Sequence, residues 1–159
     1  MIFVTVGSQK FPFERLLKQV DRMVESRIIT EEVVAQAGHS GYIPRFCRCR
    51  AFYDRDAFGA LLERCDVLIT HGGAGTMVEA VKRGKKVIAV PRLARYGEHV
   101  DDHQLELTQR FHKMGLVCAC LEVERLAEAL QWVQDYRPAP FRSNTEAFLA
   151  SLDAFLNAL

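Results

Sequence analysis

The sequence predicts an α/β fold, a single Rossmann-like domain in which a mostly parallel β-sheet is covered by helices on both faces. Short apolar, β-branched runs alternate along the chain with segments whose apolar residues recur at helical spacing. That alternation is typical of parallel sheets with helical crossovers. With 159 residues, the chain has the size of one domain, so the predicted domain spans 1–159.

The strands are predicted from apolar runs that end at glycine, proline or polar turn residues. The first run ends at Gly7, the second at Gly38, and a later run ends at Pro91. Buried strands of a parallel sheet read as continuous apolar segments, which these runs do. The predicted strands are 2–6, 33–37, 46–52, 66–70, 86–90 and 116–121.

The helices are predicted from apolar residues repeating every three or four positions. Asp54 is the predicted N-cap of one helix, and Gly84 follows the end of another, where glycine is common. Pro138 and Pro140 precede a last, amphipathic segment at the C-terminus. The predicted helices are 13–25, 54–64, 76–83, 101–114, 124–134 and 143–159.

The composition excludes several classes of protein. Apolar residues make up 49% of the chain and the net charge is +1, which argues against disorder and against general nucleic-acid binding. The N-terminus carries no basic segment or cleavage site, and no apolar run approaches the roughly 18 residues that span a bilayer, so a cytoplasmic location is expected. The odd count of 5 cysteines argues against a disulfide framework, and the pairs 47/49 and 118/120 are interpreted as buried apolar residues.

Ligands of such sheets bind outside the carboxyl ends of the strands, which here are followed by the loops 7–9, 38–40, 71–75 and 91–102. The stretch THGGAGTMVE at 70–79 combines a strand end, a glycine-rich turn and a helix start. Glycines admit a phosphate close to the backbone, and a helix N-terminus attracts anions. The dinucleotide fingerprint does not fit, because Val78 stands where its third glycine belongs, and no P-loop lysine is present.

Thr76 and Glu79 admit two interpretations. In one, Thr76 binds a phosphate oxygen while the Glu79 carboxylate accepts hydrogen bonds from two ribose hydroxyls. In the other, the pair is a capping box in which Thr76 begins the helix and Glu79 bonds back to its amide.

The segment 98–106, EHVDDHQLE, gathers polar side chains at the next strand end. Asp102, His103 and Gln104 supply a carboxylate, an imidazole and an amide, the groups that bind sugar hydroxyls; a solvated helix start is the alternative. His99 and His103 are four residues apart, which also suggests a metal site. A helix beginning near 101 would leave His99 outside it and off the face of His103, so no metal is predicted.

Three motifs together resemble a known family. They are VTVG at 4–7, HGGAGT at 71–76 with Glu79, and EHVDDHQLE at 98–106. The chain, from residue 1 to about 133, is similar to the donor-binding half of the GT-B glycosyltransferases related to the enzyme that adds N-acetylglucosamine to the peptidoglycan lipid precursor. It looks closer still to the small subunit of the eukaryotic dolichol-linked UDP-N-acetylglucosamine transferase and to the small E-type subunits of bacterial exopolysaccharide and capsule transferases.

The resemblance implies a UDP-sugar site and a metal-independent, inverting transfer with no cofactor. It implies that Glu79 binds the ribose, that His103 and Gln104, with Asp102, contact the donor sugar, and that Gly38 and His39 border the uracil. The diphosphate would be held by Gly7, Ser8, His71, Gly72, Gly73, Ala74, Gly75 and Thr76. The general base is not identified; His39, His71 and His99 are considered only for the usual pKa range of histidine, and a partner could supply the base instead.

The resemblance also implies a partner, because a GT-B enzyme has two such domains and this chain provides one. The expected partner is a membrane-associated, acceptor-binding subunit that recruits the chain to the inner face of the membrane, where a hexose-type sugar passes to a lipid-linked acceptor. The helix predicted over 143–159 either docks this partner or packs on its own sheet. The alternative functions are a non-catalytic nucleotide-sugar-binding or regulatory subunit and a sugar-nucleotide epimerase.

Overall fold

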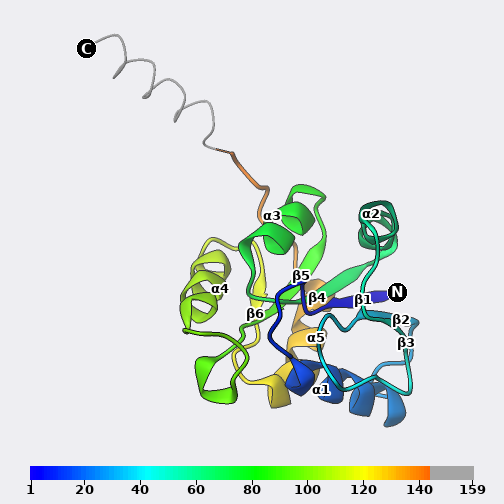
Figure 1. Ribbon diagram of the computed structural model, residues 1–159. Coiled ribbons are helices and arrows are strands. Elements are labelled where there is room, and N and C mark those ends of the chain that lie inside the picture. Colours follow the sequence, from blue (N-terminus) through cyan, green and yellow to red (C-terminus); the bar gives the residue numbers. More distant parts are fainter. Residues whose placement is uncertain (144–159) are drawn as a thin grey trace, which may run out of the picture.

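The computed structural model describes residues 1–143 and shows a parallel sheet of six strands between two layers of helices (Figure 1). The strand order is β3-β2-β1-β4-β5-β6, and every neighbouring pair is parallel. This confirms the predicted Rossmann-like α/β fold. The strands are β1 Ile2–Thr5, β2 Val33–Gln36, β3 Arg48–Arg50, β4 Val67–His71, β5 Lys86–Val90 and β6 Cys118–Ala119.

The helices divide between the two faces of the sheet. Helices α1 and α5 pack on one face, and α2 and α3, with the apolar side of α4, pack on the other. The helices are α1 Glu14–Glu25, α2 Arg55–Arg64, α3 Ala74–Lys82, α4 His103–Lys113 and α5 Leu126–Asp135, with 3-10 turns η1 Ala94–Tyr96 and η2 Val123–Arg125.

The central strands alternate their side chains between these two layers. In β1, Ile2 and Val4 join the core under α1 and α5, whereas Phe3 joins the core under α2 and α3. Both clusters are almost fully shielded from water, since Phe3 and Val4 are each 0% exposed. Burying large apolar side chains on both faces of one strand is the main stabilising contribution to such a sheet.

Some element boundaries differ from the predicted ones. The edge strands β3 and β6 are shorter than the runs 46–52 and 116–121, because an edge strand pairs on one side only. Helix α3 begins at Ala74 rather than Thr76, and α4 begins at His103 rather than near 101. Two predicted helix ends are confirmed: Asp54 accepts a 2.8 Å hydrogen bond from the amide of Ala57, and Gly84 follows α3 with a φ of +67°.

The helix predicted over 143–159 lies, apart from Ser143, outside the described residues. None of the helices in 1–143 has the length and apolar character needed to cross a bilayer. All five cysteines are free thiols; Cys118 and Cys120 are buried as expected, while Cys47 and Cys49 are only half-buried.

A buried carboxylate ties α1 to the chain that follows β2. Asp21 is 2% exposed and accepts hydrogen bonds from the Tyr42 hydroxyl at 2.5 Å and from the amides of Arg45 and Phe46 at 2.9 and 2.8 Å. Burial raises the pKa of Asp21, but these hydrogen bonds outweigh it, so the pKa lies below the ordinary 3.8. The carboxylate is therefore ionised across the neutral range.

We expect Asp21→Asn to lower the free energy of unfolding at pH 7 by about 1–3 kcal/mol, because the ionised acceptor of three hydrogen bonds is lost. The folded-state pKa is depressed, so the advantage of the wild type is complete above about pH 4 and disappears as the pH falls through the folded-state value. Urea unfolding at several pH values measures it. Asp135→Asn, at an exposed acid, is the control and should change stability by less than about 0.5 kcal/mol; equal effects of the two variants would contradict the prediction.

Candidate functional site

A pocket of about 440 Å³ opens at the carboxyl edge of the sheet, where a parallel α/β sheet binds its ligands. It brings together four residues that the sequence assigned to a nucleotide, two from the β1 loop and two from α3. The lining residues are Thr5, Gly7, Ser8, Gln36, Phe52, Tyr53, Arg55, Phe58, Thr76 and Glu79. A second hollow, of about 500 Å³, lies against β6 and α5 and contains neither glycine loop.

The N-terminus of α3 faces this region without a side-chain cap. Gly73 is the N-cap residue, and no side chain of the described chain accepts a hydrogen bond there. Thr76 therefore lies inside the first turn, and the capping-box interpretation is wrong. Glu79 instead forms an ion pair with Arg83 at 3.0 Å while it lines the pocket. The amides of the first turn thus remain available to an anion.

The glycines of the two loops are required by the imidazole of His71. A Cβ added at Gly7 would lie 2.6 Å from His71 Cε1, and one added at Gly73 would lie 2.3 Å from His71 Nε2. Gly7 also has a φ of +78°, which disfavours other residues. His71 is 8% exposed, and burial, followed by the charge of Arg92, lowers its pKa to about 4. The neutral imidazole is thus packed between the β1 loop and the α3 N-terminus.

The guanidinium of Arg92 connects the loops at this edge. It is 0% exposed and donates to the carbonyl oxygens of Val6 at 2.5 Å, Phe11 at 2.7 Å and Glu98 at 3.1 Å. Its Nε has no hydrogen-bond partner in residues 1–143. Burial lowers the pKa of Arg92 to about 10, so the group stays charged at neutral pH. One buried cation therefore holds the loop after β1 against the loop after β5.

Glu98 extends this network to α1. Its two carboxylate oxygens accept from Nε and Nη2 of Arg15, both at 2.9 Å, and one also accepts from the Leu93 amide at 3.0 Å. Glu98 is 4% exposed, so this bidentate pair is largely shielded from water. Glu98 belongs to the motif that suggested a ligand site, but its side chain is fully used in holding the loop. The sequence did not identify Arg15 or Arg92, because nothing in their spacing predicts burial.

The three residues expected to contact a donor sugar lie in different environments. Asp102 is exposed and accepts a 2.8 Å hydrogen bond from the Ala94 amide. Gln104 is 1% exposed, and its side-chain oxygen accepts from the Arg92 amide at 3.1 Å, so only its amide nitrogen is left for a ligand. The His103 side chain is 54% exposed and accessible. None of the three lines the 440 Å³ pocket.

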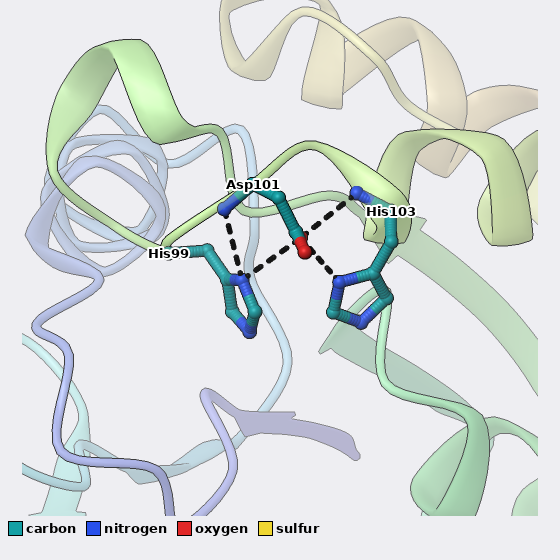
Figure 2. Close-up of side chains that lie close together, drawn as sticks. All are labelled: His99, Asp101 and His103. Atoms are coloured by element: carbon teal, nitrogen blue, oxygen red, sulfur yellow. Dashed lines mark hydrogen bonds and ion pairs between the residues drawn. The ribbon is translucent and has the colours of Figure 1, made fainter.

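His99, Asp101 and His103 come together, although His99 precedes α4 as the sequence indicated (Figure 2). The two imidazole rings lie 4.6 Å apart between centroids and nearly perpendicular, at 78°. The predicted separation of the two histidines is wrong, because the chain bends around the Asp101 carboxylate. That carboxylate lies 3.1 Å from His99 Nδ1 and also bonds His103 Nδ1.

Aromatic side chains form one wall of the pocket, and the sequence interpretation missed them. Phe52, Tyr53 and Phe58 lie in the segment that links β3 to α2 and in α2 itself. His39, which was expected to border the uracil, is exposed and packs edge-on against Phe52 at 5.1 Å. A cluster of aromatic residues after a short polar strand is the signal that could have found this wall.

The family model described as glycosyltransferase family 28 C-terminal domain matches residues 1–157. Two curated relatives, both described as UDP-N-acetylglucosamine transferase subunit ALG13, are 27% identical over 127 residues in Mus musculus and 26% identical over 133 residues in Homo sapiens. The matches cover 74% and 75% of this chain. The chain spans only about a tenth of the length of these relatives, 10% and 11%.

Solved structures show the same fold. An NMR structure of ALG13 superposes with a TM-score of 0.63 at 17% identity and covers 91% of both chains. MurG from Acinetobacter baumannii gives 0.58 at 17% identity, over 84% of this chain and 41% of that chain. The calicheamicin glycosyltransferase CalG4 gives 0.59 at 18% identity, over 84% and 34%. The chain therefore resembles one part of the two longer enzymes.

We expect Arg92→Lys to lower the free energy of unfolding by roughly 3 kcal/mol, because an ammonium cannot reproduce the planar fork that reaches Val6 and Phe11. Chemical denaturation measures the loss. The matched control is Arg95→Lys, at an exposed arginine three residues away, which should stay within about 0.5 kcal/mol of the wild type. A similar, small effect of both substitutions would show that the Arg92 network does not hold the two loops.

Proposed function

The chain belongs to the glycosyltransferase family 28 C-terminal domain family, and from this we propose that it is the donor-binding, catalytic subunit of a two-subunit inverting glycosyltransferase. In this proposal, the chain binds a UDP-sugar, and a hexose-type sugar passes to a lipid-linked acceptor during exopolysaccharide or glycolipid synthesis. The observation that carries the proposal is the pocket in which the β1 loop, the first turn of α3, Glu79 and an aromatic wall surround one hollow.

The parts of this pocket match the parts of a nucleoside diphosphate. The diphosphate would lie against Gly7, Ser8 and the uncapped amides of α3, which offer hydrogen bonds and the positive end of the helix dipole. The Glu79 carboxylate would accept hydrogen bonds from the ribose hydroxyls. The nucleobase would stack on Phe52 or Tyr53, because an aromatic ring can stack on a nucleobase without specific hydrogen bonds.

In the proposed reaction, the chain promotes transfer of the sugar by stabilising UDP as the leaving group. The acceptor oxygen attacks the anomeric carbon from the face opposite the diphosphate, the bond from that carbon to the phosphate oxygen breaks, and UDP departs with the electron pair. A base removes the proton of the acceptor hydroxyl. The α3 amides stabilise the charge that develops on the diphosphate, the task a metal performs elsewhere, so no ion is expected there. The base is proposed to come from the partner or from His39, His71 or His99.

The comparisons support a partner. Both mammalian relatives are described as subunits of a UDP-N-acetylglucosamine transferase, and this chain corresponds to about a third of CalG4. An acceptor-binding, membrane-associated subunit would supply the other half and hold the chain at the cytoplasmic face of the membrane. His103, exposed at the edge of the sheet, and Asp102 would contact the sugar between the two halves.

One observation favours the alternative, a non-catalytic nucleotide-sugar-binding or regulatory subunit. None of the described histidines lines the 440 Å³ pocket, and His71 is buried beneath its glycine loops. Without a base from a partner, such a chain would bind the donor and not transfer the sugar.

We expect Glu79→Ala to weaken UDP binding by about 10- to 100-fold, because a carboxylate bonded to two hydroxyls contributes roughly 1.5–3 kcal/mol. Isothermal titration of the purified chain measures it. Glu63→Ala is the matched control: Glu63 also pairs with Arg83, at 3.2 Å, but it does not line the pocket. The Glu79→Ala variant should also bind UDP and 2′-deoxy-UDP with the same affinity, because the carboxylate that would bond the 2′-hydroxyl is gone. Wild-type affinity in Glu79→Ala would remove Glu79 from the ribose site.

We expect transfer only when the chain is combined with an acceptor-binding partner and membranes carrying the acceptor, because the proposal places the acceptor site on that partner. Release of UDP and incorporation of labelled sugar are measured for each UDP-sugar donor. A chelator should leave the UDP affinity unchanged, because the α3 amides hold the diphosphate. Tight UDP binding with no transfer under any of these conditions would favour the non-catalytic alternative.

A further inference from the structure

We propose that His99, Asp101 and His103 form a binding site for one divalent transition-metal ion of the Zn²⁺ class. The site lies in the turn that leads into α4 (Figure 2). The proposal does not depend on nucleotide-sugar binding, because none of these residues lines the 440 Å³ pocket. It departs from the expectation of no metal, which rested on the mistaken separation of the two histidines.

The donor atoms converge from alternate residues. One ligand atom from each side chain lies within 4.8 Å of the other two. Nδ1 of His99 lies 3.1 Å from Asp101 Oδ1, and His103 Nδ1 bonds the same oxygen. Figure 2 shows both rings on one side of the backbone, with dashed lines from each Nδ1 to the Asp101 carboxylate and from His99 Nδ1 also to the Asp101 amide. Ligands of a tetrahedral ion with bonds of about 2.0–2.2 Å are separated by roughly 3.3–3.6 Å, so small rotations suffice.

The positions of the ligands are largely fixed before any ion arrives. The His99 side chain is 8% exposed and packs against Phe11, whose ring centroid lies 5.5 Å away. Asp101 Oδ1 accepts from the backbone amide of His103 at 3.1 Å, which holds the carboxylate over the start of α4. An aspartate carboxylate is ionised at neutral pH, so Asp101 offers a charged oxygen ligand. Fewer rotations are therefore lost when a metal binds.

The chemistry of the donor set selects the ion. Two imidazole nitrogens with one carboxylate oxygen suit Zn²⁺ and related transition metals, whereas Mg²⁺ and Ca²⁺ require mainly oxygen ligands. The His103 and Asp101 side chains are 54% and 57% exposed, which leaves room for water or another ligand in an open position. With Nδ1 on the metal, Nε2 of each ring carries the proton. His103 Nε2 would thus remain a donor for the sugar hydroxyl assigned to it.

The test is titration of the full chain with Zn²⁺ alone, without nucleotide, by isothermal calorimetry. We expect one Zn²⁺ per chain, and saturation should raise Tm by roughly 5 °C, since only the folded turn brings the ligands together. His103→Ala and Asp101→Asn, both at exposed positions, should each weaken binding by about 10-fold or more. His39→Ala and His112→Ala are the matched controls, because each removes an imidazole outside the cluster, and both should retain full affinity.

Cobalt substitution identifies the ligands directly. Co²⁺ bound at the cluster should give d–d absorption without a thiolate charge-transfer band, because no sulfur lies among the three ligands. A thiolate band would place the ion on cysteines and overturn the proposal. Absence of stoichiometric binding in the wild type, or binding that His103→Ala and Asp101→Asn leave unchanged, would also overturn it. UDP affinity, measured separately, reports on the proposed transferase function and not on this site.

Discussion

The carboxyl edge of the sheet depends on the buried guanidinium of Arg92. Loops at this edge contain backbone carbonyl groups that form no hydrogen bond within a strand or helix. Leaving such a carbonyl buried without a hydrogen-bond donor would destabilise the fold. Arg92 donates hydrogen bonds to backbone carbonyls of two loops: those of Val6 and Phe11 in the loop after β1, and that of Glu98 in the loop after β5. Its own charge is offset nearby by Glu98, which in turn is held by Arg15 of α1. Two loops distant in sequence are thereby joined beneath the surface at which we propose that the nucleotide binds.

This support explains how a bare glycine loop can have one conformation. Glycine has the largest conformational freedom of any residue, so a loop rich in it needs external contacts to become ordered. In this protein the contacts come from the side chain of His71, which packs against both loops. His71 fills the space between Gly7 and Gly73, and its proximity to Arg92 contributes to keeping the imidazole neutral. The first turn of α3 begins beside these loops and has no side-chain cap within residues 1–143, so its amides remain available to an anion.

The same edge contains two chemically different regions. The pocket near β1 and α3 combines backbone amides, a carboxylate and aromatic rings, which suits a nucleotide. The turn before α4 combines imidazoles with a carboxylate, which suits a metal ion. The neighbouring residues Gln104 and His103 differ in the same way: the buried Gln104 side-chain oxygen accepts from the Arg92 amide, whereas the His103 side chain is exposed. The family resemblance assigned His103 of the second region to a donor sugar and did not predict a metal there.

The sequence by itself determined the alternation of strands and helices and the glycine loop before α3, because these follow from local periodicity and from the backbone demands of glycine. It also indicated the shared location of Gly7, Ser8, Thr76 and Glu79, since carboxyl ends of parallel strands meet at one edge. Only the tertiary structure decided which polar residues are buried. Arg92, Glu98 and Gln104 look like solvent-exposed residues in the sequence, but contacts distant along the chain bury them. It likewise decided that His99 meets His103, because the bend around Asp101 is a hydrogen-bonded turn that no helical or strand period describes.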